Sequence, residues 1–284
     1  MTSSARPTAH TLDIGDGRVL RVHDSGIPAG GKAADLTIIW HHGSPQSGTL
    51  LEPLLRAASE RAIRLIGYGR ASYGGSTPHP GRTVASAAAD VERIADALGL
   101  ESFAVMGASG GGPHALACAA LLPDRVTATA CLAGIAPFTT AFDWFDGMVA
   151  PDGLRAALDG REARALFAQT DEFNEESFIG ADYRALSADW SSLGADAGAA
   201  GDQWPDGLID DDVAFTIPWG FELADIASPV LLVQGDLDRV VPAAHARWQL
   251  SQLSNGELWQ RPHDGHISVL AASAVAMDWL RARS

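Results

Sequence analysis

The sequence predicts an α/β fold in which a mostly parallel sheet is flanked by helices, in a chain of 284 residues. Short apolar runs alternate with helical segments in the first and last parts of the chain, as in β–α–β units with right-handed crossovers. A Gly-x-Ser-x-Gly sequence at 107–111 lies between one such run and a helical segment. A long acidic stretch without β-branched runs interrupts the alternation after residue 136.

The elements of the first half follow one another regularly. Residues 12–25 predict a hairpin across Asp16-Gly17, because this dipeptide favours a tight turn. Continuous apolar runs then predict strands buried on both faces, and amphipathic segments predict helices between them. The predicted strands are 36–40, 64–69, 102–109 and 125–137; the predicted helices are 51–62, 83–100, with Thr83 as N-cap, and 111–123.

The alternation resumes only near residue 225. The intervening segment is aromatic and helical in pattern, so we predict a core domain of residues 1–136 and 225–284 with a mainly helical insertion, the lid, at 137–224. Within the lid, residues 194–202 (GADAGAAGD) have the composition of a flexible linker. The predicted last elements are a strand at 229–235, a helix at 243–253, a strand at 256–262 and a helix at 267–283.

Composition excludes several classes of protein. Hydrophobic residues make up 46% of the chain, which excludes intrinsic disorder. The net charge of −15 argues against binding to nucleic acid or to an anionic membrane surface. The first 17 residues contain no apolar run that would predict a signal peptide, and no uncharged apolar stretch approaches the roughly 20 residues of a membrane span. We therefore expect a soluble, cytoplasmic protein.

The negative charge is concentrated in the lid. Residues 137–224 contain 18 Asp and Glu against 4 Arg, a net charge of −14, whereas the rest of the chain is nearly neutral. One interpretation is a solvated outer face that favours solubility. The other is a gate that disfavours anionic substrates and attracts amines.

Ser109 is the predicted nucleophile. Small residues flank it between a buried strand and a helix, as a tight strand-to-helix turn requires. Such a turn exposes the hydroxyl at the carboxyl edge of the sheet, where open α/β folds bind ligands. The alternative is an ordinary glycine-rich turn without catalytic function.

A serine hydroxyl needs a base, and the base needs an orienting acid. His266 follows the last predicted strand and is the predicted base, with His263 as its nearest rival. Asp238 and Asp236 both follow the strand at 229–235; we favour Asp238 as the acid and keep Asp236 as the alternative. For either aspartate, the non-catalytic interpretation is a turn residue bonded to its own backbone.

These motifs together resemble the α/β-hydrolase fold family over nearly the whole chain. The resemblance is carried by His42-Gly43-Ser44-Pro45, Gly107-Ala108-Ser109-Gly110-Gly111, Gly235-x-x-Asp238-x-x-Val241-Pro242 and Gly265-His266, in the chain order nucleophile, acid, base. The resemblance implies a lid after the sixth strand. It also implies an oxyanion hole formed by two backbone N–H groups, which in this chain belong to Ser44 and Gly110.

The resemblance implies a serine hydrolase that needs no cofactor. We expect no metal site, because His41-His42 has no carboxylate at ligand spacing and the two cysteines, Cys118 and Cys131, lie in apolar segments. The serine excludes relatives with an aspartate nucleophile. Of the lid tryptophans, about half are expected to close its core and the others to line an acyl pocket; they are Trp144, Trp190, Trp204 and Trp219.

The favoured substrate is a small, neutral carboxylic ester, cleaved through an acyl-enzyme. The alternatives are an amidase similar to prolyl aminopeptidases, a C–C bond hydrolase, and a ligand-binding protein with the same fold and no turnover. The expected partner is a small-molecule substrate, with no nucleic acid and no membrane. A homo-oligomer is compatible with this sequence.

Overall fold

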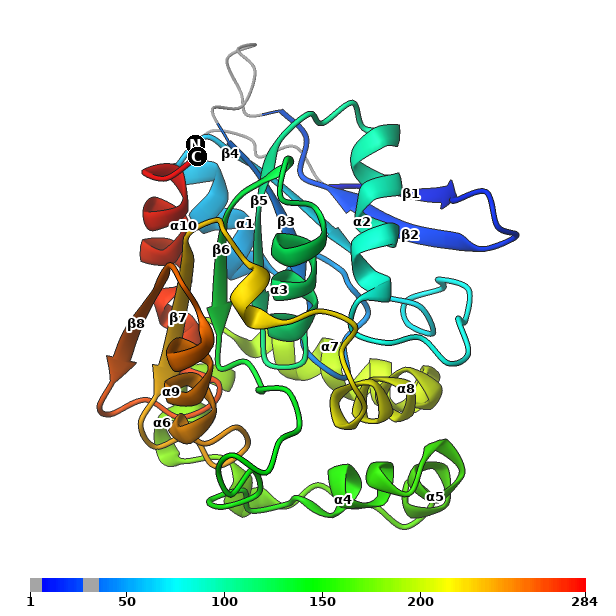
Figure 1. Cartoon of the computed structure of the whole chain (residues 1–284), viewed down its shortest axis with the longest axis vertical. Coiled ribbons are helices and arrows are strands. Elements are labelled where there is room, and N and C mark those ends of the chain that lie inside the picture. Colours follow the sequence, from blue (N-terminus) through cyan, green and yellow to red (C-terminus); the bar gives the residue numbers. More distant parts are fainter. Residues whose placement is uncertain (1–6, 28–35) are drawn as a thin grey trace.

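The strands in the described part of the chain form a single sheet in the order β1-β2-β4-β3-β5-β6-β7-β8 (Figure 1). The computed structural model describes residues 7–27 and 36–284. β2 pairs antiparallel with β1 and β4, and all other pairs are parallel, which confirms the predicted fold class. The strands are β1 (Thr8–Asp13), β2 (Val19–Asp24), β3 (Leu36–His41), β4 (Ile63–Tyr68), β5 (Phe103–Ala108), β6 (Val126–Leu132), β7 (Val230–Gly235) and β8 (Gly256–Arg261).

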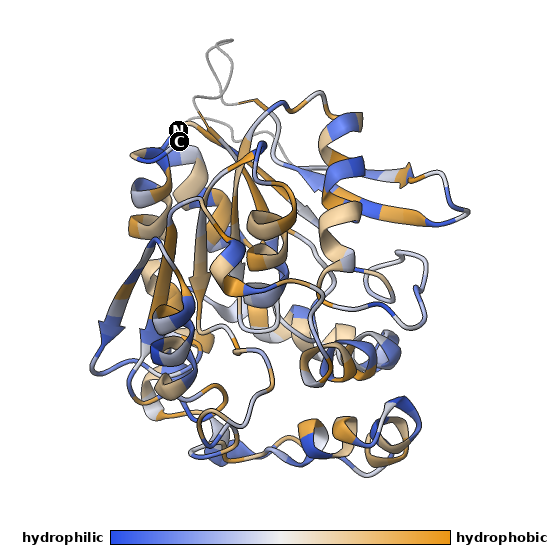
Figure 2. Ribbon diagram, viewed as in Figure 1, coloured by the Kyte–Doolittle hydropathy of each residue, from blue (hydrophilic) through white to orange (hydrophobic). Residues whose placement is uncertain are grey.

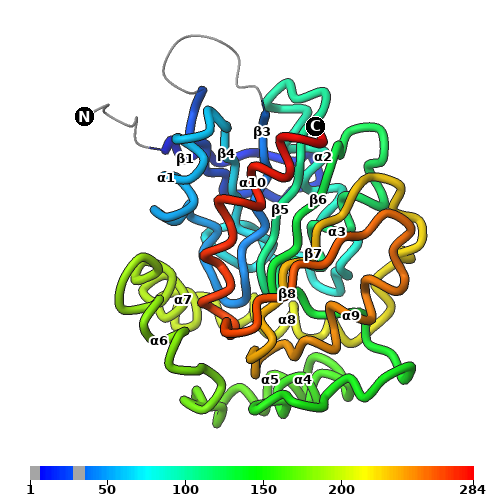
Figure 3. Tube along the Cα trace, turned by 90° about the vertical axis from the view of Figure 1, so that its left-hand side faces the viewer, coloured from blue at the N-terminus to red at the C-terminus, as the bar shows by residue number. Residues whose placement is uncertain are grey.

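Helices cover both faces of the sheet (Figures 1 and 3). One face carries α1 (Glu52–Glu60) and α10 (Ser273–Arg281), and the other carries α2 (Ser86–Ala97), α3 (Gly111–Leu121) and α9 (Ala243–Gln252). The central strands are apolar on both faces, and Figure 2 shows this as continuous hydrophobic colour along them. In β3, for example, Ile39 packs on the α2 and α3 side, whereas Ile38 and Trp40 pack on the α1 side.

The predicted hairpin is confirmed, since Leu12 pairs with Leu20 and Asp13 with Val19. The predicted N-cap of α2 is wrong. The helix begins at Ser86, and the backbone N–H of Thr83 donates to Ser86 Oγ at 3.0 Å instead of Thr83 capping the helix. The backbone N–H of Ala85 donates to the carbonyl of Trp219 at 2.9 Å. This distant contact, which local sequence does not reveal, fixes the turn that precedes the helix.

Between β6 and β7 the chain forms a series of short helices, most of them at the carboxyl ends of the strands, whereas the last, η2, lies beside α3 (Figure 1). They are α4 (Asp152–Leu158), α5 (Arg161–Phe167), η1 (Glu175–Ser177), α6 (Gly180–Leu186), α7 (Ser191–Gln203), α8 (Pro205–Thr216) and η2 (Leu223–Asp225). The helical insertion predicted after β6 is therefore present. We continue to call residues 137–224 the lid.

The predicted linker at 194–202 is wrong, because these residues lie within α7. Alanine favours helix strongly enough to offset the glycines when packing supports the helix. Gly194 and Gly201 face Leu186 and Pro45, where an added Cβ would lie 3.6 and 3.8 Å from the side chains. Both distances are ordinary van der Waals contacts, so α7 packs on α6 and on the loop after β3 without a close approach that requires glycine.

The last predicted helix is divided into η3 (Ser268–Ala272) and α10.

Trp144, Trp190 and Trp219 are buried in the two cores that flank the sheet, so most of the lid tryptophans serve packing. Cys118 and Cys131 are buried free thiols, as expected. Within residues 7–27 and 36–284, no helix is long and apolar enough to cross a membrane.

Candidate active site

Ser109 lies on a sharp turn between β5 and α3. Its φ of 52° is in the left-handed region, which is strained for a residue with a side chain. The backbone holds the turn, because the N–H of Ser109 donates to Leu132 at 2.9 Å and the N–H of Gly112 donates to the carbonyl of Ser109 at 2.9 Å. A Cβ on Gly111 would overlap the carbonyl oxygen of His41. Glycine at position 111, two residues after Ser109, is therefore required by the close approach of α3 to β3.

His266, in the loop after β8, reaches this hydroxyl. Its Nε2 lies 2.9 Å from Ser109 Oγ, and its Nδ1 lies 2.8 Å from Asp238 Oδ2. Three residues from separate loops thus form one hydrogen-bonded chain. Because the carboxylate accepts at Nδ1, the proton of a neutral imidazole is held there and Nε2 is left to accept from the serine.

The carboxylate of Asp238 is itself fixed. Its Oδ1 accepts from the backbone N–H groups of Val240 and Val241, both at 2.9 Å. Its Oδ2 accepts from Gln234 Nε2 at 3.1 Å as well as from His266. Asp238 is therefore both a turn residue bonded to its own backbone and the partner of the histidine.

Asp236 is directed elsewhere. Its Oδ1 accepts from Gln260 Nε2 at 2.8 Å and lies 3.5 Å from Arg247 Nη2, and its side chain is 30% exposed. The geometry therefore separates two aspartates that the sequence left as alternatives, and it brings only Asp238 to the histidine.

Two opposing effects determine the pKa of His266. Burial of the ring disfavours the imidazolium, whereas the negative charges of Asp238 and Asp182 favour it. The balance raises the pKa of His266 above its usual range. Asp238 comes from the loop after β7, and Asp182 comes from α6 of the lid.

The other buried histidines have structural partners. Burial lowers the pKa of His41 to about 3 and that of His245 to about 4, so both are neutral. His245 accepts from the N–H of Ala136 at 3.1 Å and donates to the carbonyl of Trp144 at 2.9 Å. His114 bonds the carbonyl of Gly110 at 2.7 Å. His263, the nearest rival to His266, is exposed at the surface.

Ser44 and Gly110, whose N–H groups are the predicted oxyanion donors, lie side by side. A Cβ on Gly110 would overlap the Ser44 hydroxyl, and a Cβ on Gly43 would lie 3.6 Å from Ser109 Cβ. In the described part of the chain, no hydrogen bond uses the backbone N–H of Ser44 or Gly110. Both donors are thus next to the serine and available to an acceptor.

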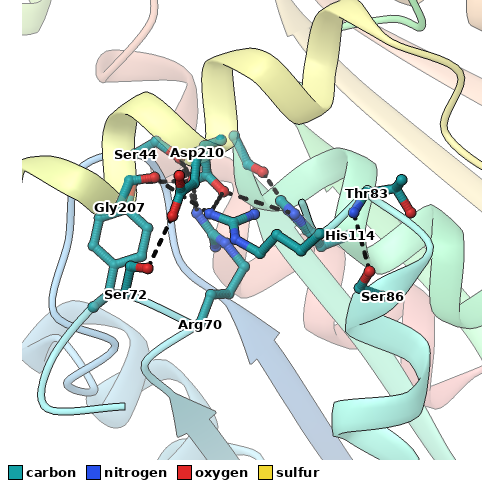
Figure 4. A network of polar contacts seen from close by, with 12 residues as sticks. Ser44, Arg70, Ser72, Thr83, Ser86, His114, Gly207 and Asp210 are labelled. Atoms are coloured by element: carbon teal, nitrogen blue, oxygen red, sulfur yellow. Dashed lines mark hydrogen bonds and ion pairs between the residues drawn. The ribbon is translucent and has the colours of Figure 1, made fainter. Parts of the chain in front are cut away.

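A buried ionic network underlies the Ser44 loop (Figure 4). Arg70, in the loop after β4, donates from Nη2 to Ser44 Oγ at 2.8 Å and to Asp211 Oδ2 at 2.5 Å. It also donates to the carbonyl of His42, and Asp211 accepts from the Ser44 hydroxyl. Figure 4 shows Arg70 and Ser44 beneath the yellow helix α8, which carries Asp211. The lid therefore contacts the loop that holds a predicted oxyanion donor.

Asp211 is fully buried and ionised. Burial opposes the charge, but Arg70 and Arg82 hold the pKa of Asp211 well below its usual range. Arg82 lies 2.6 Å from Asp211 Oδ1, and the hydroxyl of Tyr73 donates to Oδ2 at 3.0 Å. Sequence reasoning did not find this network. Asp211 lies 141 positions from Arg70, and no local pattern marks the pair.

A second lid carboxylate contacts the same loop. Asp196 of α7 accepts from the backbone N–H of Ser47 at 3.1 Å and from the Ser47 hydroxyl. Among the described residues, no group of three or more His, Cys, Asp and Glu side chains is arranged to hold a metal ion. The hydrogen-bonded chain through His266 can activate the Ser109 hydroxyl for attack on a carbonyl carbon. The part of the Ser44 and Gly110 N–H groups in stabilising the oxygen that becomes negative stays a prediction.

Comparison with known proteins gives relatives of one fold. A non-heme chloroperoxidase from Streptomyces lividans is 28% identical over 230 residues, which cover 77% of this chain and 80% of that protein. A bromoperoxidase from Bacillus anthracis has a TM-score of 0.72 at 20% identity, covering 97% of this chain and 98% of that one. A thermophilic esterase from Thermogutta terrifontis has a TM-score of 0.71 at 18% identity, covering 99% and 100%.

At such identities the structural likeness shows the fold alone, because one fold carries many activities. A family profile described as alpha/beta hydrolase fold matches residues 37–272, which include every residue of the site. The chain belongs to the alpha/beta hydrolase fold family.

Proposed function

We propose that the protein is a serine hydrolase that cleaves a small, neutral carboxylic ester through an acyl-enzyme. The observation that carries the proposal is the hydrogen-bonded chain from Ser109 Oγ through His266 to Asp238, at 2.9 and 2.8 Å. A hydroxyl in this arrangement loses its proton to the imidazole as it attacks, and the carboxylate stabilises the resulting imidazolium.

In the first half of the reaction, Ser109 Oγ forms a bond to the carbonyl carbon and its proton passes to His266 Nε2. The carbonyl oxygen becomes negative and accepts from the N–H groups of Ser44 and Gly110. Each such donor typically contributes about 2.7–4 kcal/mol to the transition state. The bond to the alkoxy oxygen then breaks, and the alcohol leaves with the proton from His266.

In the second half, water attacks the acyl carbon and gives a proton to His266. The bond to Ser109 Oγ breaks, the serine recovers a proton, and the carboxylic acid leaves. Charge supports a neutral substrate, because 13 of the 18 acidic lid residues are exposed and repel anions. An ester is supported by the esterase among the structural relatives.

A second candidate is peroxide-dependent halogenation, which the names of the chloroperoxidase and bromoperoxidase relatives favour. The same acyl-enzyme would then be resolved by hydrogen peroxide instead of water, giving a peracid. The peracid would oxidise a halide to hypohalous acid and return to the carboxylic acid. This candidate uses the same residues and differs only in the acceptor of the acyl group.

The amidase alternative needs a carboxylate that holds a substrate ammonium. Three lid carboxylates that contact the loops of the site, the buried Asp182 and Asp211 and the half-buried Asp196, each already accept hydrogen bonds from the chain. This engagement favours the ester over an aminoacyl substrate.

The test is turnover by the wild type and by Ser109→Ala. The substrates are p-nitrophenyl esters of increasing acyl length, prolyl and other aminoacyl arylamides, and p-nitrophenyl acetate with hydrogen peroxide and bromide. We expect the wild type to favour short acyl esters and Ser109→Ala to lose turnover while its circular dichroism stays unchanged. Full activity in Ser109→Ala would overturn the proposal. A wild type that prefers arylamides would be an amidase, and one that prefers the peroxide reaction would be a peroxide-dependent halogenating enzyme.

A ligand-binding protein with this fold would give no turnover. A fluorophosphonate probe separates the two, because it forms a bond to an activated serine oxygen with loss of fluoride. We expect labelling of the wild type at Ser109 and none of Ser109→Ala. An unlabelled wild type would favour the ligand-binding alternative.

A further inference from the structure

Asp182 is a fully buried carboxylate in α6 of the lid, with 0% of its surface exposed. No ion pair in the described part of the chain involves it. A buried charge without a cation is costly unless hydrogen bonds replace its hydration. The groups that donate hydrogen bonds to Asp182 in place of water therefore indicate its role.

Three of these partners belong to the residues that follow His266. Oδ1 accepts from the backbone N–H groups of Ile267 at 2.9 Å and Ser268 at 2.7 Å, and from the Ser268 hydroxyl at 2.8 Å. Oδ2 accepts from the N–H of Ile179, in the lid itself, at 3.0 Å. One carboxylate therefore ties α6 to the loop that carries the base.

The residue before His266 is held by the same group. A Cβ on Gly265 would overlap the Asp182 carboxylate, so the glycine makes room for it. The N–H of Gly265 donates to Ser268 Oγ at 2.8 Å, and that hydroxyl donates to Asp182. The backbone on both sides of His266 is thus fixed through one lid side chain.

We propose that Asp182 is a positioning residue for His266, through which the docked lid both orients the base and supplies a second negative charge to it. The inference rests on the proposed function, since it assigns a role toward the base of that reaction. In the described residues, the charged groups acting on the imidazole are Asp238, from the loop after β7, and Asp182, from α6. Ser109 lies at its other nitrogen.

The consequence is a link between lid docking and catalysis. Ser109, Asp238 and His266 all belong to the core, yet the loop of His266 is completed by a residue 85 positions away in the lid. When α6 leaves the core, Ile267 and Ser268 lose their acceptor and the imidazolium loses a stabilising charge. The serine is then less reactive even though its own turn is unchanged.

The experiment measures the rate of fluorophosphonate labelling of the full chain against pH, which requires the base but no natural substrate. Asp182→Asn keeps the shape and removes the charge. We expect its labelling rate to fall by about 10- to 100-fold, the scale of a misplaced catalytic group. We also expect the midpoint of its acid limb to move to lower pH by on the order of one unit.

Two variants serve as controls. Ser268→Ala removes the hydroxyl link but keeps the charge, so its labelling slows while its midpoint stays at the wild-type pH. Asp189→Asn changes an exposed lid carboxylate whose side chain is 73% exposed, and it should match the wild type in both respects.

An Asp182→Asn midpoint equal to that of the wild type overturns the inference, as does an equal shift in Asp189→Asn. If Asp182→Asn does not fold, the labelling rate of Ser268→Ala is the test. A rate in Ser268→Ala equal to that of the wild type overturns the inference. A wild type that does not label at all contradicts the proposed function instead, so the two failures are distinguishable.

Discussion

Asp211 of helix α8 and Arg70 of the loop after β4 form an ion pair at 2.5 Å in which neither side chain is more than 3% exposed. A buried pair of this kind is fixed in place, because separating the partners would leave each charge without water. It joins the lid to the loop of Ser44, just as Asp182 joins the lid to the loop of His266. The lid is therefore part of the framework that holds the loops of Ser44 and His266.

Loss of Asp211 should destabilise the protein strongly. Asp211→Ala leaves Arg70 and Arg82 buried without their common partner, so we expect the free energy of unfolding to fall by about 3–5 kcal/mol. Urea denaturation monitored by tryptophan fluorescence measures this. Asp206→Ala, which removes a carboxylate that is 64% exposed beside Arg161, should cost less than about 1 kcal/mol. Similar losses in both variants would contradict the structural role of the buried pair.

The two aspartates after β7 should differ sharply in their effect on turnover. Asp238→Asn removes the charge that stabilises the imidazolium and allows the wrong tautomer, so kcat should fall by about 10⁴-fold. Asp236→Asn changes only contacts with Gln260 and Arg247 and should leave kcat close to that of the wild type. The measurement is steady-state hydrolysis of one p-nitrophenyl ester by both variants. A larger loss in Asp236→Asn would reverse the assignment.

The pH dependence of activity should follow His266. The imidazole must be neutral to accept the proton of Ser109, and Asp238 and Asp182 raise its pKa despite burial of the ring. Activity should therefore fall as the pH drops, and the acid limb of kcat/KM should have its midpoint above the usual histidine value of about 6.5. A midpoint below that value would show that burial outweighs the two carboxylates.

The stability of the lid should depend on pH through Asp212. Burial raises the pKa of this carboxyl to about 6, although Arg164 Nε donates to it at 2.6 Å. The folded state then binds more protons than the unfolded state between about pH 4 and pH 6, so this contribution to stability falls as the pH rises through that window. The stability of Asp212→Asn relative to the wild type should increase from pH 4 to pH 7. A constant difference across this range would refute the expectation.

The acidity of the lid has two parts. Of its 18 acidic residues, 13 are exposed, which fits the interpretation of a solvated outer face. Four others are buried at Asp182, Asp210, Asp211 and Asp212, and these bind backbone groups or arginines. Composition identified the charge but could not separate these roles, because burial depends on which core residues the lid contacts.

Local patterns were sufficient where the chemistry is local. Gly107 to Gly111 marked the serine turn, and most apolar runs located their strands to within one residue at each end. The predicted strand 125–137 was too long, because β6 ends at Leu132. Local patterns failed where contacts between distant parts of the chain determine the structure. The alanine-rich residues 194–202 form a helix because α7 packs on its neighbours, and the choice between Asp236 and Asp238 depends on which carboxylate turns toward a loop 28 residues away.

The contacts by which Asp182 and Asp211 join the lid to the core could not be predicted from sequence patterns. Asp182 and Asp211 contact residues 85 and 141 positions away, and their neighbours in the chain resemble those of the exposed acids. One signal was present: Gly265, directly before His266, has no turn conformation that would require glycine and is explained by the carboxylate packed against it.

The most direct test of the account is the mass of the enzyme during turnover. The wild type, mixed with excess p-nitrophenyl ester and quenched in acid within the first turnovers, should carry one added acyl group. Peptide mapping should locate this group on Ser109, and Ser109→Ala should carry none. Ester hydrolysis that proceeds without an adduct, or with the adduct on another residue, would contradict the central claim that Ser109 is the nucleophile activated by His266 and Asp238.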